Sequence, residues 1–231
     1  MNTFSSSNNR GKPGSDSGRK ERRDGAQKRV RKRKPLDQTA LRDLALSYAA
    51  RFATTGAKLE SYLARKIRER GTAEDSDGRT LDLDVPTLVA RLIELGYVND
   101  DAYARAKSRD LTARGYGARR VEQALWAAGV DEGVREDHAP TEATAREAAA
   151  LLAKKRRFGV YSDKLRADEE GEYEGGLQDV NSHKLREKQV AAMLRAGHKM
   201  DHVRFIMDAS AVADVEQWIQ EALEEQGYDN D

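Results

Sequence analysis

The sequence contains no cysteine among its 231 residues. This absence excludes disulfides, thiolate metal sites, iron–sulfur ligation and cysteine nucleophiles. No apolar run approaches the ~20 residues that span a bilayer, and the N-terminus lacks the apolar stretch of a secretory signal. We therefore expect a cytoplasmic protein that does not associate with membranes.

Proline and aromatic residues are also scarce, with four prolines and 6% Phe, Trp and Tyr. A chain rich in Ala, Arg, Leu and Glu with few β-branched or aromatic residues favours helix. Hydrophobic residues make up 38% of the chain and charged residues 35%. The composition therefore predicts a helical protein with a real core and a heavily charged surface.

The net charge of +1 conceals a strong segregation along the chain. Residues 1–34 carry twelve Lys or Arg against three Asp or Glu, whereas 162–182 carry two against seven. Residues 205–231 carry eight acidic residues and no basic one. Such blocks of one sign are typical of solvated or interacting segments, and we expect residues 1–35 to be a disordered basic tail.

From Leu36 onward, apolar residues recur at helical spacing, beginning with Leu41, Leu44 and Tyr48. Three later helices each end in glycine, with an apolar residue four positions earlier: Ile67 before Gly71, Leu125 before Gly129 and Met193 before Gly197. This recurrence predicts helical units that stack in tandem. One irregular helical bundle remains the alternative, because the spacing between the units is uneven.

The pattern divides the chain into five segments. They are a tail (1–35), a first repeat (36–98) with a polar loop (72–84), a second repeat (99–140), a third repeat (141–210) with an acidic insert (162–182), and an acidic C-terminal helix and tail (211–231).

Several of these stretches together resemble the RecX family of regulatory proteins. The resemblance spans about residues 38–210 and is most specific at 114–121 (RGYGARRV) and 92–100 (LIELGYVND). Residues 40–45 (ALRDLA), 58–63 (KLESYL) and 194–198 (LRAGH) follow the same order. Lys58 departs from the family, which often has an acidic residue there. The tail, the loop, the insert and the acidic end have no clear family counterpart.

The resemblance implies an all-α, elongated and curved array of three tandem three-helix repeats. It also implies a non-enzymatic, monomeric protein without cofactor or metal. Its partner would be a RecA-type recombinase filament on DNA, whose ATPase and strand exchange it would modulate in homologous recombination, DNA repair and the SOS response. The alternative is a direct, non-specific DNA-binding protein that contacts single- or double-stranded DNA through its basic tail and arginine cluster.

Basic and aromatic side chains are the candidate contacts for such a partner. Arginine forks onto carboxylate or phosphate, and tyrosine stacks on bases. On charge alone, solvated faces are the favoured interpretation, and the basic run at 154–157 also complements a helix C-terminus. The resemblance reverses that preference for residues 109–120. The candidates are Arg109, Arg114, Tyr116, Arg119, Arg120, Lys154, Lys155, Arg156, Arg157, Lys184, Arg186 and Arg195.

Two patterns weakly suggest a metal site. His198 and His202 share a helical face, but no third ligand is evident, so structural or surface histidines are the favoured interpretation. The acidic run at 168–174 lacks the order of a calcium loop and favours a solvated loop. No convergent catalytic set is visible, and we expect neither metal nor catalysis.

Overall fold

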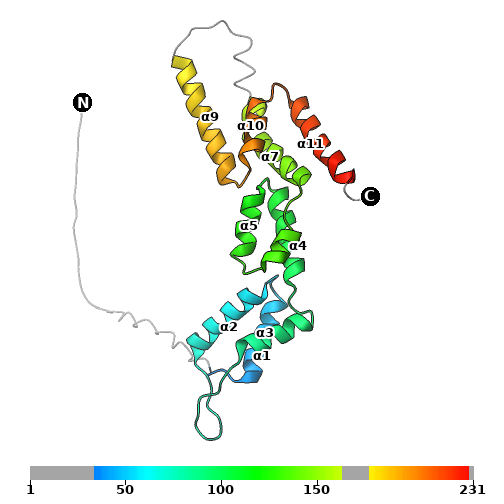
Figure 1. Cartoon of the computed structure of the whole chain (residues 1–231). Helices are drawn as coiled ribbons and strands as arrows, with labels where there is room; N and C mark the ends of the chain where they lie inside the picture. Colours follow the sequence, from blue (N-terminus) through cyan, green and yellow to red (C-terminus); the bar gives the residue numbers. More distant parts are fainter. Residues whose placement is uncertain (1–33, 163–176, 229–231) are drawn as a thin grey trace, which may run out of the picture. The chain divides into compact units, whose positions relative to one another are not determined.

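A computed structural model describes residues 34–162 and 177–228. The chain divides after Arg33 into two units, and the second contains all the described elements. These elements are α1 (Gln38–Ala49), α2 (Gly56–Arg70), α3 (Val85–Glu94), α4 (Asp100–Ala113), α5 (Ala118–Trp126), α6 (Glu132–Asp137), α7 (Glu142–Arg156), the 3-10 helix η1 (Gly159–Tyr161), α9 (Leu177–Arg195), α10 (Met200–Asp208) and α11 (Val212–Tyr228) (Figure 1). The described residues form no named strand, so the predicted all-α class is confirmed.

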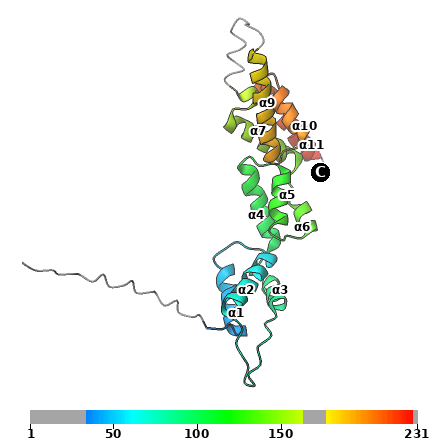
Figure 2. The same ribbon diagram turned by 90° about the vertical axis from the view of Figure 1, so that its left-hand side faces the viewer.

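The first helical group consists of α1, α2 and α3 (Figure 2). These helices pack around one apolar cluster. Leu41, Leu59, Leu63 and Val89 are buried in it, in agreement with the helical stripes of the sequence. Each helix begins at a polar cap: Asp37, Thr55 and Asp84 accept the N–H of the residue three positions on. Phe52 continues the apolar spacing of Leu41 and Tyr48, but it lies beyond the end of α1 and is exposed.

The segment predicted as a polar loop, 72–84, lies between α2 and α3. It contains no helix, but isolated bridges pair Leu36 with Thr72 and Glu74 with Thr80. The Leu36 N–H donates to the Gly71 carbonyl at 2.9 Å, and the Ala73 N–H donates to the Leu36 carbonyl at 2.8 Å. The predicted first repeat is therefore held in place from its first residue, Leu36.

The second group consists of α4, α5 and α6 around a smaller cluster of buried residues. These residues are Ala104, Leu111, Val121, Leu125, Ala128 and Val130. Arg135 links the group by donating to the Val130 carbonyl at 2.7 Å and to Glu122 at 2.7 Å. These two bonds hold the short helix α6 against α5.

The third group combines α7, η1, α9, α10 and α11 around the largest cluster. Two boundaries differ from the sequence prediction. Helix α9 begins at Leu177, inside the predicted insert 162–182, so the last part of that insert is helical. Helix α11 packs closely on α7 through buried Val215, Trp218 and Ala222, so it shares the third core. The remaining insert residues 163–176, the tail 1–33 and residues 229–231 lie outside the described part.

Two junctions join consecutive groups through backbone in close contact. At the first, Thr55 Oγ1 donates to the Ala128 carbonyl at 2.5 Å, and a Cβ on Gly129 would lie 2.3 Å from that of Ala57. At the second, the Gly117 N–H donates to the Ala196 carbonyl at 3.0 Å, and the Arg119 N–H donates to Gly197 at 3.2 Å. Each junction joins the start of one helix to the glycine turn that ends another. The tandem-repeat arrangement and the elongated, curved shape remain predictions.

Candidate binding surface

The basic candidates lie mostly at helix ends in the second and third groups. Arg109 is exposed on α4, and Arg114 and Tyr116 lie in the turn between α4 and α5. Arg119 and Arg120 are exposed in the first turn of α5. The basic run Lys154–Arg157 ends α7, and Lys184, Arg186 and Arg195 are exposed on α9.

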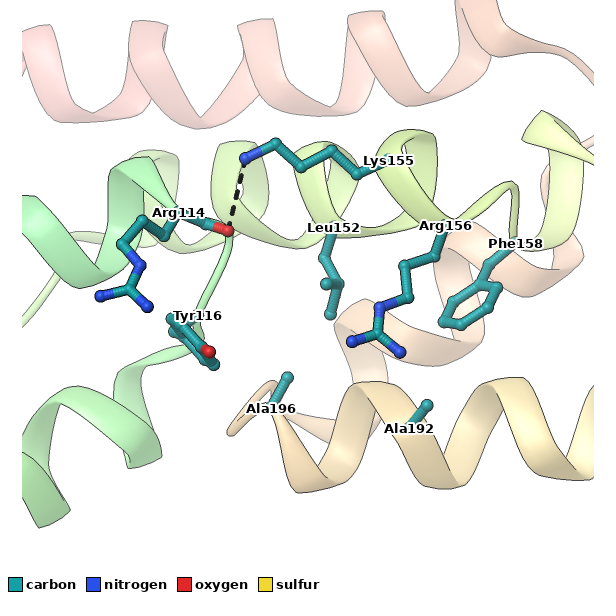
Figure 3. A pocket seen from close by; sticks show the side chains of 8 residues that line it. All are labelled: Arg114, Tyr116, Leu152, Lys155, Arg156, Phe158, Ala192 and Ala196. Atoms are coloured by element: carbon teal, nitrogen blue, oxygen red, sulfur yellow. Dashed lines mark hydrogen bonds between the residues drawn. The ribbon is translucent and has the colours of Figure 1, made fainter. Parts of the chain in front are cut away.

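The structure brings four of these candidates together around one cavity of about 260 Å³. Its lining residues are Arg114, Tyr116, Leu152, Lys155, Arg156, Phe158, Ala192 and Ala196. Figure 3 shows Leu152, Arg156 and Phe158 projecting from the α7 side toward Ala192 and Ala196 on α9. The site is therefore a basic rim over an apolar floor.

Two contacts hold the rim in place. Lys155 Nζ donates to the Arg114 carbonyl at 3.5 Å, which links the end of α7 to the turn after α4 (Figure 3). The Arg114 guanidinium lies 5.4 Å from the centre of the Tyr116 ring, within the range of a cation–π contact. Arg114 also pairs with Asp110 at 3.4 Å, but both side chains are more than half exposed, so that pair is weak.

A second cavity of about 500 Å³ adjoins the first, since Arg156 and Phe158 line both. Its other lining residues are Arg157, Ser162, Leu185, Lys188 and Gln189. The turn after α7 shapes this region, because Arg157 adopts the left-handed conformation (φ 54°) and the Phe158 N–H donates to the Ala153 carbonyl at 2.9 Å. The Gly159 N–H then donates to Gln189 Oε1 at 3.2 Å, which fixes the turn on α9.

The remaining candidates do not line the first cavity. Arg186 has partners of its own, because it donates to the Met207 carbonyl at 2.6 Å and pairs with Asp208. It therefore ties α9 to the end of α10. Arg109, Arg119, Arg120, Lys154, Lys184 and Arg195 line neither cavity.

Sequence reasoning missed the apolar half of the surface, namely Leu152, Phe158, Ala192 and Ala196. Two signals were available. Phe158 directly follows the basic run, and the two alanines lie four positions apart, on one face of α9. Neither signal shows that α7 and α9 lie side by side with space between them.

The two histidines of the sequence pattern are buried in the third group. His198 Nε2 donates to the Gly115 carbonyl at 3.1 Å, and burial lowers the pKa of its ring. His202 Nε2 lies 2.8 Å from Glu142 Oε1. Burial raises the pKa of Glu142, but hydrogen bonds from Arg146, His202 and Lys199 outweigh it and lower that pKa to about 2. Both histidines are therefore structural.

Neither a metal site nor a membrane span is found within residues 34–162 and 177–228. In these ranges, no three His, Asp or Glu side chains gather as a metal site would require. None of the helices in this part of the chain has the length and apolar character of a bilayer crossing.

The fold and the surface together define an all-α protein of small helical groups with a basic, partly apolar groove. Comparison with known proteins narrows this class further. No family model matches the chain. A regulatory protein RecX from Thermus thermophilus is 37% identical over 124 residues, covering 53% of this chain and 77% of the relative. One from Myxococcus xanthus is 29% identical over 186 residues, covering 79% and 90%.

A solved structure shares the fold. The crystal structure of RecX from Lactobacillus salivarius matches with a TM-score of 0.51 at 19% identity, covering 73% of this chain and 93% of the other. The chain belongs to the RecX family of regulatory proteins. Its role is accordingly regulatory.

Proposed function

We propose that this protein binds a RecA-type recombinase filament on DNA and lowers its ATP hydrolysis and strand exchange. The observation that carries the proposal is membership of the RecX family, through relatives named as regulatory proteins. The order and spacing of the family-like stretches between residues 38 and 210 support the same partner.

The surface chemistry agrees with a charged, polymeric partner. Arg114, Lys155 and Arg156 line one cavity and come from two different helical groups. Arginines can fork onto carboxylates or phosphates, both of which a nucleoprotein filament presents. Several weak contacts to one polymer add as avidity. Under this proposal the protein acts as a monomer and needs no cofactor.

The experiment is a titration of the full chain into recombinase that hydrolyses ATP on single-stranded DNA. We expect hydrolysis to fall at protein concentrations below that of the recombinase, because one bound regulator affects several subunits. Unchanged hydrolysis at saturating protein would contradict the proposal. Inhibition that excess DNA fully relieves would instead show competition for DNA.

Direct DNA binding through the basic tail is the second candidate, favoured by twelve basic residues within 1–34. Deleting residues 1–33 separates the two and preserves the backbone hydrogen bonds of Leu36 to Gly71 and Ala73. A filament regulator keeps most of its effect on ATP hydrolysis after this deletion. A tail-driven DNA binder loses most of its affinity for DNA, and its affinity falls steeply with salt.

A further inference from the structure

The two adjoining cavities form one feature, which we call the α7–α9 groove. It comprises the residues that line the cavities of about 260 and 500 Å³. Arg156 and Phe158 lie at the point where the cavities meet, since they line both. The groove therefore offers two successive hollows that share one cationic and one aromatic side chain.

The charge of the groove is of one sign. Its basic lining residues are Arg114, Lys155, Arg156, Arg157 and Lys188. No Asp or Glu is among the described residues that line it. Among the described residues, no carboxylate forms an ion pair with Arg156, which lines both hollows. The ligand of such a groove is an anion.

The groove is also apolar and aromatic at its floor. Tyr116 and Phe158 contribute aromatic rings (Figure 3). The other floor residues, Leu152, Ala192 and Ala196, have no polar side-chain atoms. A small hydrated anion gains nothing from such a floor. A ligand that uses the whole groove carries flat apolar groups as well as negative charges, and it extends across both hollows.

We propose that the α7–α9 groove binds a short stretch of single-stranded nucleic acid. Its bases stack on Tyr116 and Phe158, and Arg114, Lys155 and Arg156 hold its phosphates. A basic groove with interleaved aromatic rings is the usual arrangement for single strands, since every base has a face on which a ring can stack. A duplex offers phosphates to this groove but keeps its base faces stacked inside.

An acidic peptide fits the groove less well. An extended peptide needs acceptors for its backbone N–H groups, and the groove has no strand edge among its described residues. Among the described lining side chains, the amide oxygen of Gln189 already accepts the Gly159 N–H. The apolar floor is also short, with two alanines on α9 in place of the long aliphatic row that an amphipathic helix requires.

The turn that carries Phe158 is held in one conformation. Arg157 is the one non-glycine residue with positive φ in the described chain. The corresponding turns after α2, α5 and α9 use glycine, at Gly71, Gly129 and Gly197. A non-glycine residue in this region is strained, and such strain concentrates at functional sites. Arg156 and Phe158 are the sequence neighbours of Arg157, and both line the groove.

The test uses the full chain without recombinase, so its outcome is independent of filament binding. Fluorescence anisotropy measures binding of a labelled oligothymidylate and of an abasic strand with the same number of phosphates. We expect the oligothymidylate to bind about tenfold more tightly, because only it can stack. Phe158→Leu keeps apolar packing in the third core and should remove most of that difference.

A matched pair of charge reversals distinguishes binding in the groove from non-specific electrostatic attraction to the protein. Arg156→Glu lies in the groove, whereas Arg42→Glu changes an exposed arginine on α1 by the same charge. We expect about tenfold weaker binding for the first and less than about threefold for the second at the same salt. Circular dichroism confirms that both variants are folded.

Three results would overturn the proposal. They are equal affinity for the abasic strand and the oligothymidylate, equal losses for the two reversals, and tighter binding of a polyglutamate peptide of matched charge. The last result would assign the groove to an acidic protein segment. None of these results bears on the proposed effect on ATP hydrolysis, which is measured with recombinase.

Discussion

Replacing Gly117 with alanine tests the junction between the second and third helical groups. A Cβ at this position would lie 2.4 Å from both the carbonyl carbon and the oxygen of Gly197, and 2.5 Å from the His198 nitrogen. These are backbone atoms, so no side-chain rotation relieves the clash. The φ of Gly117 is −81°, which alanine adopts without strain, so the substitution tests the contact alone.

The clash can be relieved in two ways, and both predict a similar loss of stability. If the junction holds, overpacking of a close contact costs about 1 to 3 kcal/mol. If the junction opens, the hydrogen bonds from Gly117 to Ala196 and from Arg119 to Gly197 are lost, at roughly 1 kcal/mol each. The His198 bond to Gly115 lies at the same junction and adds a similar amount. We therefore expect Gly117→Ala to lower the free energy of unfolding by about 2 to 3 kcal/mol.

Urea unfolding followed by circular dichroism measures this change. Gly133→Ala is the matched control, since a Cβ there meets only Asp131 Oδ1 at 3.5 Å and the backbone lies within α6. The control should leave stability unchanged or raise it by about 0.5 kcal/mol. A Gly117→Ala protein within about 0.5 kcal/mol of the control would refute the close contact.

Two further substitutions test the first junction and the third core. Thr55→Val keeps the buried shape but removes the cap of α2 and leaves the Ala128 carbonyl unsatisfied, so we expect a loss of about 2 to 3 kcal/mol in urea unfolding. Thr39→Val, at an exposed position of α1, should change stability by less than about 0.5 kcal/mol. Glu142→Gln removes the charge of this carboxylate and should lower the free energy of unfolding at neutral pH by about 1 to 2 kcal/mol. The loss is no larger because the side chain is 40% exposed, and water screens its charge. The folded-state pKa of about 2 lies below the ordinary 4.5, so the wild type loses this contribution as pH falls from about 4.5 toward 2. A difference between the two proteins that is equal at neutral pH and at pH 2 would contradict this linkage.

Local chemistry made the helices predictable from the sequence. Thr, Asp and Asn are typical N-cap residues, and Thr55, Asp84, Asn99 and Thr141 each accept the backbone N–H of the residue three positions on. The glycines at 71, 129 and 197 end helices with positive φ, as only glycine does readily. These signals act within one helical turn, so a single sequence contains them in full.

Packing between distant segments could not be predicted in the same way. Gly117 and Gly197 are eighty positions apart, and the need for a residue without Cβ at Gly117 follows from its contact with the Gly197 backbone. Arg186 read as a basic candidate, and its partners on α10 became visible only in three dimensions. An acidic C-terminal segment likewise gave no sign that Trp218 packs under Arg146, whose guanidinium lies 4.8 Å from the ring centre.

Only part of the candidate surface could be predicted from the sequence. Arg114, Tyr116, Lys155 and Arg156 stand out as charge and aromatic signals in the sequence. Their common cavity depends on Ala192 and Ala196, whose small side chains leave space between α7 and α9. Absence of side-chain volume is a weak sequence signal, so the apolar floor was missed.

Co-sedimentation with recombinase filaments tests the central claim most directly. The protein, the recombinase, ATP and single-stranded DNA are centrifuged together, with matched samples that omit the recombinase or the DNA. We expect the protein to pellet mainly with the complete filament, at salt concentrations that remove it from DNA alone. Equal pelleting with DNA in the absence of recombinase, or none with the filament, would contradict the proposed regulation.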